Sequence, residues 1–388
     1  MPWLSRAHRK AVRKGITIRS SLLRNFSILI VLVLIAFTAV LLILEFSELS
    51  VLSRRLVTEA VHEMKSELQT IFQPVVKNIN ISAHWGRSKH YNSFQSKEIL
   101  EMFMPILNEY DYIVRIKSCD SMGNGFSLAR APDDKDEWIS TRTYNDEDVP
   151  KKLITKWDDD LALSDSKWEF VRQDLRQENW YLSVIDKEPY RMGWNKPFFL
   201  ENTKDLVITA SIKVESGMGE SYVLAFDIFL KDLQEIMEKT VLSENGVVFI
   251  STFDDHLIGL SGNVLKRLAM SNFDLALQSI HDFNLPQVKD LLLEWNSKEW
   301  HRLNKVVYFS SGGDRWVGTI VKFPEEGAPI LKIGMLAPMS DVMKYDMTRG
   351  VSIFVIFICA LIFAFILTKK MSNRFITPVQ QILEQSIK

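Results

Sequence analysis

Two long segments near the ends of this chain contain no charged residue, and they restrict its fold more than any other feature. They are residues 26–44 (FSILIVLVLIAFTAVLLIL) and residues 351–368 (VSIFVIFICALIFAFILT). A helix rises about 1.5 Å per residue, so each segment can cross the roughly 30 Å hydrocarbon core of a bilayer. A buried core helix usually has polar residues on one face, which neither segment has. The first segment is also longer than the apolar region of a cleavable signal peptide. The sequence therefore predicts two membrane-spanning helices.

Basic residues flank both predicted spans on the sides that face the chain ends. Residues 1–25 contain seven arginines or lysines and no acid, and residues 369–388 contain four against one glutamate. Cytoplasmic segments carry an excess of Lys and Arg, so both ends are predicted to be cytoplasmic. The whole chain has 47 Lys+Arg against 48 Asp+Glu, so the region between the spans is acidic. We expect residues 45–350 to lie outside the cytoplasm.

The cysteines and the overall charge narrow the class of protein further. Cys119 falls in the outer region and Cys359 in the second span, so the outer region cannot form an internal disulfide. Such a region suits a bacterial periplasm, and hence an inner-membrane protein, better than a eukaryotic cell surface. The net charge of −1 argues against a nucleic-acid-binding protein.

Residues 45–80 are predicted to form one long helix that leaves the membrane. Apolar side chains recur at spacings of three and four, at Leu49, Leu52, Leu56, Ala60, Met64, Leu68, Ile71, Val75 and Ile79. Such a face could pack on the helix's own domain or on a second copy of the chain. We expect the second arrangement, a stalk that forms a parallel homodimer.

The remaining outer region alternates strand-like and helical patterns. Strands are predicted at 112–117, 125–129, 206–214, 221–230, 246–251, 305–310, 315–322 and 331–337, and helical spacing at 98–108, 231–240 and 263–295. A glycine-containing turn joins 206–214 to 221–230 as a hairpin. Residues 131–200 are rich in Trp, Asp and Arg and give no clear element. Hairpins with inserted helices indicate an α+β fold.

This ordered set of segments resembles the double Cache family of bacterial extracytoplasmic sensors. The resemblance rests on Trp180-Tyr181, 193–199 (GWNKPFF), 207–211 (VITAS), 224–228 (LAFDI), 244–250 (ENGVVFI) and 315–318 (RWVG). It implies a stalk helix with two PAS-like modules, membrane-distal at 81–235 and membrane-proximal at 236–345. Residues 369–388, with Pro378, resemble the start of a HAMP linker. The sequence stops within the first helix of that linker, so we expect a longer protein with a cytoplasmic output domain, such as a kinase, cyclase, phosphatase or chemoreceptor domain.

The resemblance also implies a ligand pocket in the distal module, where aromatic side chains enclose the ligand and a strand carboxylate holds an amine. Asp227 lies in the otherwise apolar segment LAFDIFL, and a carboxylate is costly to bury unless it is paired or bound. It could accept a ligand amine or form a salt bridge, for example with an arginine. Trp180, Tyr181, Trp194 and Phe198 could form the aromatic cage or belong to the core.

The sequence departs from the amino-acid-binding branch of that family. Glu178 stands where the branch has an arginine that holds a carboxylate, and the nearest upstream arginine is Arg176. Its later tyrosine and aspartate correspond to Phe198 and Leu200, which cannot do the same work. An α-amino acid is therefore not favoured. An amine, another polar ligand, or no small ligand remain open.

No enzyme motif accompanies these features. The chain has no His-Glu-x-x-His, P-loop, Gly-x-Ser-x-Gly or Cys-x-x-Cys pattern, and its acidic runs lack the spacing of a calcium loop. We expect no catalytic residue, metal or cofactor in this chain. A membrane receptor is the favoured function. The alternatives are a periplasmic interaction or structural subunit and, less favoured, a hydrolase with a cleft in 131–200.

Overall fold

The computed structural model describes residues 3–88, 96–131, 137–145, 150–171, 173–200, 205–215, 219–268, 270–297, 305–324, 331–344, 355–364, 366–367 and 370. The chain divides into two compact units, Met1–Arg55 with Ser340–Lys388, and Leu56–Met339. The predicted HAMP segment, apart from residue 370, lies outside the described residues. The predicted module boundary at 235/236 falls inside the second unit and stays a prediction.

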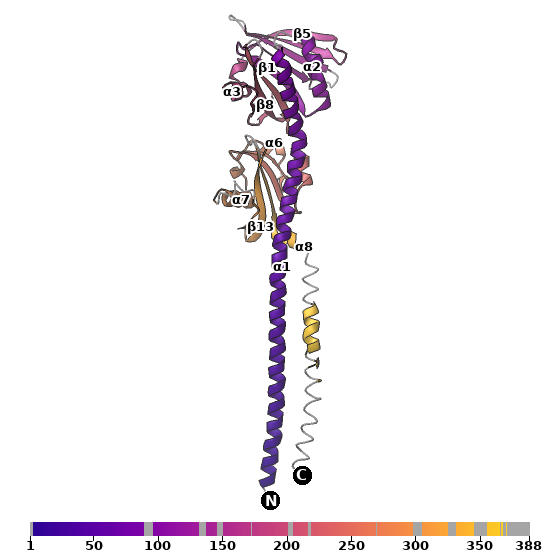
Figure 1. Cartoon of the computed structure of the whole chain (residues 1–388), viewed down its shortest axis with the longest axis vertical. Coiled ribbons are helices and arrows are strands. Elements are labelled where there is room, and N and C mark those ends of the chain that lie inside the picture. Colours follow the sequence, from indigo (N-terminus) through magenta and orange to yellow (C-terminus); the bar gives the residue numbers. More distant parts are fainter. Residues whose placement is uncertain are drawn as a thin grey trace. The chain divides into compact units, whose positions relative to one another are not determined.

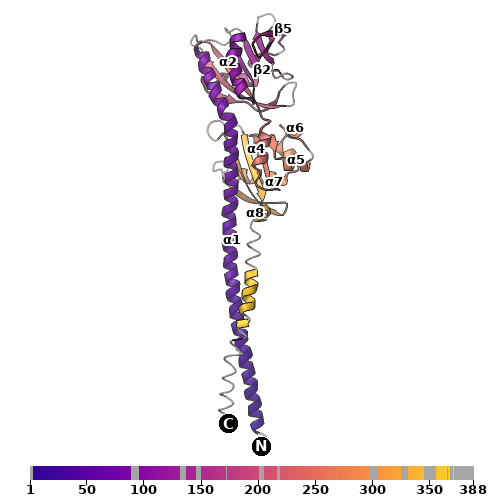
Figure 2. The ribbon, with the colours of Figure 1, turned by 90° about the vertical axis from the view of Figure 1, so that its right-hand side faces the viewer.

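Helix α1 (Trp3–Ser88) is continuous through the first predicted span and the predicted stalk. In the part of the chain that the structure describes, no helix is both long enough and apolar enough to cross a membrane. One face of α1 is buried at intervals of three and four residues, at Val57, Val61, Met64, Leu68, Phe72, Val75, Ile79 and Ala83. This face packs against the sheets of the same chain, and α1 lies along both of them (Figures 1 and 2). Packing on its own domain therefore accounts for most of the predicted stalk pattern.

The first sheet has nine antiparallel strands in the order β5-β4-β3-β2-β1-β9-β8-β6, and β7 also pairs with β8. The predicted hairpin is confirmed as β8–β9, in which Ala210 pairs with Phe226. Residues 131–200 contribute five strands that the sequence pattern did not indicate. The strands are β1 (Ile113–Asp120), β2 (Gly125–Arg130), β3 (Glu137–Tyr144), β4 (Lys151–Asp158), β5 (Leu163–Phe170), β6 (Met192–Trp194), β7 (Phe198–Phe199), β8 (Leu206–Glu215) and β9 (Ser221–Phe229).

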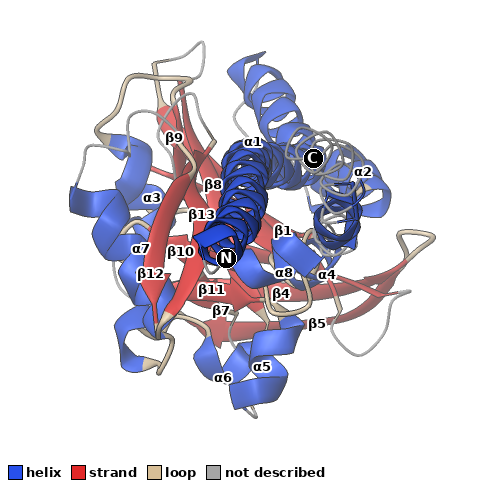
Figure 3. Cartoon of the chain, turned by 90° about the horizontal axis from the view of Figure 1, so that it is seen from below, coloured by secondary structure: helices blue, strands red, loops and turns tan. Residues whose placement is uncertain are grey.

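Helices cover the two faces of the central strands of this sheet. On one face, Ile208, Ala210 and Ile212 of β8 share a core with α1 and with α2 (Ser96–Glu109). On the other face, Val223 and Ala225 of β9 pack under α3 (Asn179–Ile185). Figure 3 shows α1 and α3 on opposite sides of β8 and β9. We call these the stalk face and the α3 face.

The second sheet has five antiparallel strands in the order β11-β10-β14-β13-β12. These are β10 (Val247–Thr252), β11 (Leu257–Leu260), β12 (Val307–Ser311), β13 (Asp314–Phe323) and β14 (Leu331–Pro338). One face packs under α5 (Gly262–Leu268), α6 (Asn272–Leu275) and α7 (Pro286–Ser297). Helix α4 (Leu233–Lys239) precedes this sheet and α8 (Met339–Lys344) follows it. Two antiparallel sheets with helices on their faces confirm the predicted α+β class.

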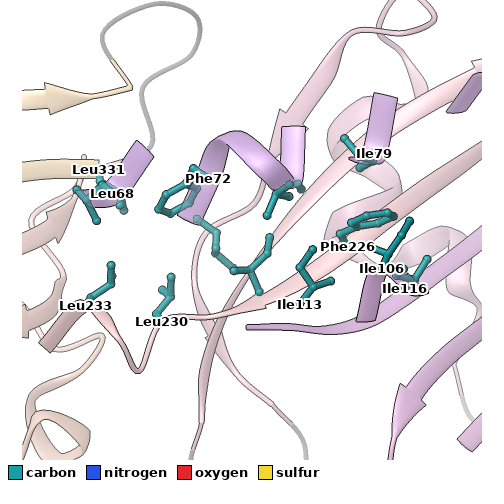
Figure 4. Packing of buried hydrophobic residues seen from close by; sticks show 14 of the residues in the cluster. Leu68, Phe72, Ile79, Ile106, Ile113, Ile116, Phe226, Leu230, Leu233 and Leu331 are labelled. Carbon is teal, nitrogen blue, oxygen red and sulfur yellow. The ribbon is translucent and has the colours of Figure 1, made fainter. Parts of the chain in front are cut away.

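One core runs from the first sheet through α1 to the second sheet. It contains Ile113 and Phe226 from the first sheet, Leu68 from α1, and Leu331 from the second (Figure 4). Phe72 lies at the centre, with its ring 5.2 Å from that of Trp194 and 5.5 Å from that of Phe323. Burial of large side chains contributes roughly 1.5–3 kcal/mol each, so this core ties both sheets to the helix.

Candidate functional site

A buried charged cluster lies at the centre of the α3 face. Side chains alternate between the two faces along a strand, so Arg115 and Lys117 of β1 share one face. Arg115 pairs with Asp227 of β9, and Asp227 pairs in turn with Thr209 of β8. The sheet register therefore places an arginine, a carboxylate and a threonine in one row, with Lys117 beside them in the next row.

Asp227 is fully buried and accepts four close contacts. Its Oδ2 accepts from Arg115 Nε at 2.8 Å and from Lys117 Nζ at 3.0 Å. Its Oδ1 accepts from Thr209 Oγ1 at 2.6 Å and lies 2.8 Å from Lys117 Nζ. The salt bridge that the sequence left open as one role for Asp227 is thus present, and it involves a lysine as well as an arginine.

The local charges decide the ionisation of this cluster. Burial alone would raise the pKa of Asp227, but Lys117, Arg115 and the Thr209 hydrogen bond outweigh it, so the pKa lies below its ordinary value. Burial lowers the pKa of Lys117, and Arg115 lowers it further, whereas Asp227 and the more distant Glu178 oppose both. Two cations thus surround one carboxylate, which is held in its ionised form.

Aromatic rings from separate elements lie beside the Lys117 ammonium. Its Nζ is 5.1 Å from the ring centroid of Trp180 on α3 and 6.0 Å from that of Phe198 on β7, within the range of cation–π attraction. Tyr181 packs edge-on against Trp180 with centroids 6.1 Å apart. Burial raises the pKa of Tyr181 to about 12, so its hydroxyl stays protonated at neutral pH. The structure therefore brings four of the five predicted residues together: Trp180, Tyr181, Phe198 and Asp227.

Trp194, the fifth predicted residue, faces the other way. It pairs with Ala210 of β8, whose side chain belongs to the stalk-face core, and its ring packs against Phe72 of α1. The next residue along the chain, Asn195, donates its backbone N–H to the Thr209 carbonyl at 3.0 Å. The side chain predicted to line a cage is thus placed between the sheet and the stalk.

The structure also places Glu178, which stands at the arginine position of the amino-acid-binding pattern, and Arg176, the nearest upstream arginine. The Arg176 guanidinium is held by Asp174 at 2.6 Å and donates to the Ser121 carbonyl at 3.1 Å, so it is engaged outside the cluster. Glu178 is the N-cap of α3, and its side chain makes no capping hydrogen bond. Neither residue holds the Asp227 cluster in place.

Arg115, Lys117 and Thr209 are the residues that sequence reasoning missed. Arg115 and Lys117 lie in the predicted strand 112–117, which gave no sign of a charge partner, and the lysine lies 110 positions from its carboxylate partner. A usable signal was present in Asp227 itself, since a carboxylate in an apolar strand requires a cation opposite it.

Buried polar atoms without a partner border the cluster. Among the residues described, neither the Ser211 hydroxyl nor Asn195 Oδ1 has a hydrogen-bond partner. Ser211 of β8 pairs with Ala225 of β9, and Ala225 pairs with Lys117 of β1. The backbone of Asn195 is hydrogen-bonded to that of Thr209. An unpaired buried polar atom costs about 1–3 kcal/mol, which a bound polar molecule would offset.

Other features of the second unit are separate from this cluster. Lys332 of β14 is buried against Asp255 and the ring of Trp295 on α7, which is a second lysine–aspartate pair. A hollow of about 580 Å³ lies between α1 and β13, and its lining includes His62 and Thr319 but none of the five predicted residues. Within the described ranges, no group of three His, Cys, Asp or Glu side chains could hold a metal ion.

Comparisons with known proteins give structural matches only. No protein-family model and no curated protein matches the chain. The ligand-binding domain of Mlp24 with asparagine is 15% identical, with a TM-score of 0.48, and the match covers 77% of this chain and 97% of that one. The ligand-binding domain of the Pseudomonas aeruginosa PAO1 amino acid chemoreceptor PctC, in complex with GABA, is 11% identical (TM-score 0.47; 73% and 98% covered). The periplasmic sensory domain of the Campylobacter jejuni chemoreceptor Tlp1 is 12% identical (TM-score 0.48; 76% and 96% covered).

These matches are sensory or ligand-binding domains, and two of the three are named as chemoreceptors.

Proposed function

We propose that this chain is the sensory part of a two-pass receptor in a bacterial inner membrane, and that the α3 face of its first sheet binds a small polar ligand. The observation that carries the proposal is the buried Asp227 cluster under the aromatic side chains of α3 and β7. Ligand sites combine an apolar enclosure with a few fixed polar groups, and this cluster has both. No catalytic activity is proposed for the chain.

The two-pass arrangement draws support from apolar side chains that other parts of the chain leave uncovered. On α1 the exposed residues include Leu29, Leu32, Val33 and Phe37, and in the second apolar segment they include Ile356 and Phe363. Soluble proteins rarely expose contiguous apolar surface of this extent, and a bilayer would cover it. We therefore retain both predicted spans, with both chain ends in the cytoplasm.

The homodimer remains part of the proposal, but with a smaller contact surface. Met64 is buried in the chain's own core, whereas Leu52 and Leu56 are 37% and 40% exposed on α1. A second copy of α1 could pack against these exposed apolar residues. The proposed stalk contact therefore involves the stretch around 52–56 and excludes Met64.

A chain of contacts leads from the cluster to α1. Thr209 donates to Asp227 and accepts the backbone N–H of Asn195, and the neighbouring Trp194 ring packs on Phe72. A ligand can change the stalk only if it favours one of two arrangements of these contacts. We propose that this change passes along α1 and the second span to a cytoplasmic output domain.

A thermal-shift screen of the full chain in detergent micelles against a metabolite library tests the proposal. A ligand that binds only the folded state stabilises it by RT ln(1 + [L]/Kd), about 2.7 kcal/mol at 100 times Kd. Thr209→Val should reduce the ligand-induced shift, because it removes the hydrogen bond that helps to hold Asp227, and through it Arg115 and Lys117, in place without changing the side-chain shape. Thr319→Val, at a buried threonine of β13, is the matched control and should keep the shift.

A second candidate function follows from the four contacts that Asp227 already makes within the chain. If no compound raises the melting temperature, the cluster is a structural ion-pair network and the receptor proposal fails. The chain would then be an interaction subunit, in which the aromatic residues belong to the core.

A further inference from the structure

Asp227 has no free capacity to receive a ligand amine. A carboxylate offers about four lone-pair positions, and the contacts from Arg115 Nε, Lys117 Nζ and Thr209 Oγ1 number four. A ligand cation would also have to lose its water shell beside two positive charges. Like charges at such short range disfavour one another in a buried site.

The aromatic surface is occupied as well. The ammonium of Lys117 lies near the rings of Trp180 and Phe198, where a ligand cation would otherwise gain cation–π attraction. The chain thus supplies from its own β1 strand the cation that an amine ligand would bring. An amine has neither an acceptor nor a ring face left to bind.

The groups of the Asp227 cluster that can still bind a ligand are hydrogen-bond donors. A guanidinium has five N–H groups, and Arg115 uses its Nε on Asp227. Its two terminal amino groups make no hydrogen bond to any residue that the structure describes, and its side chain is 32% exposed, so solvent reaches it. Lys117 has a third N–H beyond the two directed at the carboxylate oxygens. Arg115 and Lys117 outnumber the one carboxylate that they contact directly.

We propose that the α3 face recognises a small carboxylate, with the terminal amino groups of Arg115 and the ammonium of Lys117 as its donors. Arginine binds carboxylates through two parallel N–H···O bonds, which gives orientation as well as affinity. Ser211 of β8, whose buried hydroxyl lacks a partner in the described region, lies in the row of Lys117 with Ala225 of β9 between them, and it can donate to a further oxygen of the ligand. The inference rests on the proposed sensory function and replaces the amine ligand that the sequence left open.

Glu178 sets a limit on the affinity of this site. Its carboxylate is close enough to raise the pKa of Lys117, so it also opposes an incoming anion. Because its side chain makes no capping bond to α3, Glu178→Gln should leave the helix intact. We expect this variant to bind a carboxylate more tightly than the unaltered chain.

The test compares carboxylates with neutral and cationic compounds of the same size on the full chain in detergent. The probes are acetate, glycolate and succinate, their amides acetamide, glycolamide and succinamide, and the amines methylamine, ethanolamine and putrescine, all at equal ionic strength. At least one carboxylate should raise the melting temperature with a saturable dose dependence, and its amide should not. Arg115→Gln should weaken that binding about tenfold or more, through loss of a charge-assisted pair. Arg315→Gln, at an exposed arginine of β13, is the matched control and should leave it unchanged.

The outcomes separate this inference from the proposed function. Saturable binding of an amine, or carboxylate binding that survives Arg115→Gln, would overturn the carboxylate assignment and leave the sensory function standing. Binding of another library compound with no response to any carboxylate would do the same. If neither the probes nor any library compound raises the melting temperature, both proposals fail.

Discussion

The ring of Phe72, on α1, packs edge-on against the ring of Trp194, on β6, with centroids 5.2 Å apart. The same phenylalanine contacts Phe323 of the second sheet at 5.5 Å. One side chain of α1 therefore contacts both sheets. Any movement of β6 relative to α1 must change this contact, because packed interiors deform little before they rearrange.

Truncation of this ring should destabilise the fold. We expect Phe72→Ala to lower the free energy of unfolding by about 3–5 kcal/mol, since it removes a buried aromatic side chain and leaves a cavity. Urea denaturation followed by circular dichroism measures the change. Ile81→Ala, at a half-exposed position of the same helix, should cost less than about 1 kcal/mol. Equal effects of the two variants would show that the Phe72 contact does not hold the sheets.

Removal of Asp227 alone should be more damaging than its removal together with Lys117. Asp227→Ala leaves Lys117 buried without its partner, and we expect a loss of about 3–5 kcal/mol. Combining it with Lys117→Met removes the uncompensated charge, so the double variant should recover part of that loss. Chemical denaturation of the single and double variants measures the recovery. A double variant less stable than Asp227→Ala alone would contradict the buried pair.

The cluster should also make stability depend on acid pH. The pKa of Asp227 lies below its ordinary value, so between about pH 4 and its folded pKa the unfolded chain binds a proton that the folded chain does not. Its contribution is therefore fully present above about pH 4 and is lost as the pH falls through the folded pKa. Asp254, whose pKa is lowered mainly by its hydrogen bond with Lys196, acts in the same direction.

Urea midpoints between pH 7 and pH 3 measure this dependence. Asp227→Asn should reduce the slope below pH 4, and the part that remains should come from Asp254 and other carboxylates. An unchanged slope would mean that the Asp227 carboxyl titrates alike in the folded and unfolded chain.

Cys119 should be unreactive in the folded protein. It is fully buried on β1, and burial, with Asp120 and Asp174 nearby, raises the pKa of its thiol above the ordinary value. The thiolate is the reactive form, so alkylation should be very slow. In a Cys359→Ser background, iodoacetamide labelling followed by mass spectrometry should be negligible before urea is added and complete afterwards. Rapid labelling of the folded chain would show that β1 is accessible under α3.

Disulfide crosslinking tests the proposed α1 contact between copies. In the same Cys359→Ser background, Leu52→Cys and Leu56→Cys should form covalent dimers upon mild oxidation, because both positions are exposed on α1. Met64→Cys should not, since Met64 is buried in its own core. Dimers at Met64, or none at the other two positions, would refute the proposed contact around 52–56.

The sequence indicated the central strands well and the outer strands of the first sheet poorly. Strands such as β8 and β9 are buried along nearly their whole length, so they appear as apolar runs. Strand β5 is exposed at seven of its eight positions, and Trp168 and Phe170 alternate there with charged side chains. Four polar residues separate Leu163 from this pair, so the segment lacks the sustained alternation that predicts a strand.

The site could be predicted only in part, for a different reason. Trp180, Tyr181 and Asp227 lie in segments that the resemblance assigned to a ligand pocket in the distal module. Lys117 could not be assigned, because a lysine in a short strand normally points to solvent and only the pairing of β1 with β9 brings it to Asp227. The face of Trp194 depended on the short strand β6, which carries too few residues to show alternation.

The register shift at the start of β1 has a consequence for how the gene can vary. Ile113 pairs with Ile228 in the stalk-face core, yet Arg115, two residues later, pairs with Asp227 on the opposite face. Residues two apart in a regular strand share a face, so it is the extra residue at Val114 that separates them. Deleting Val114 would make Ile113 and Arg115 consecutive residues, which a regular strand places on opposite faces, so their pairing with Ile228 and Asp227 would persist without the bulge. This position of β1 should therefore accept the loss of one residue, whereas the regular stretch 115–120 should not, because a one-residue change there turns side chains to the opposite face of the sheet.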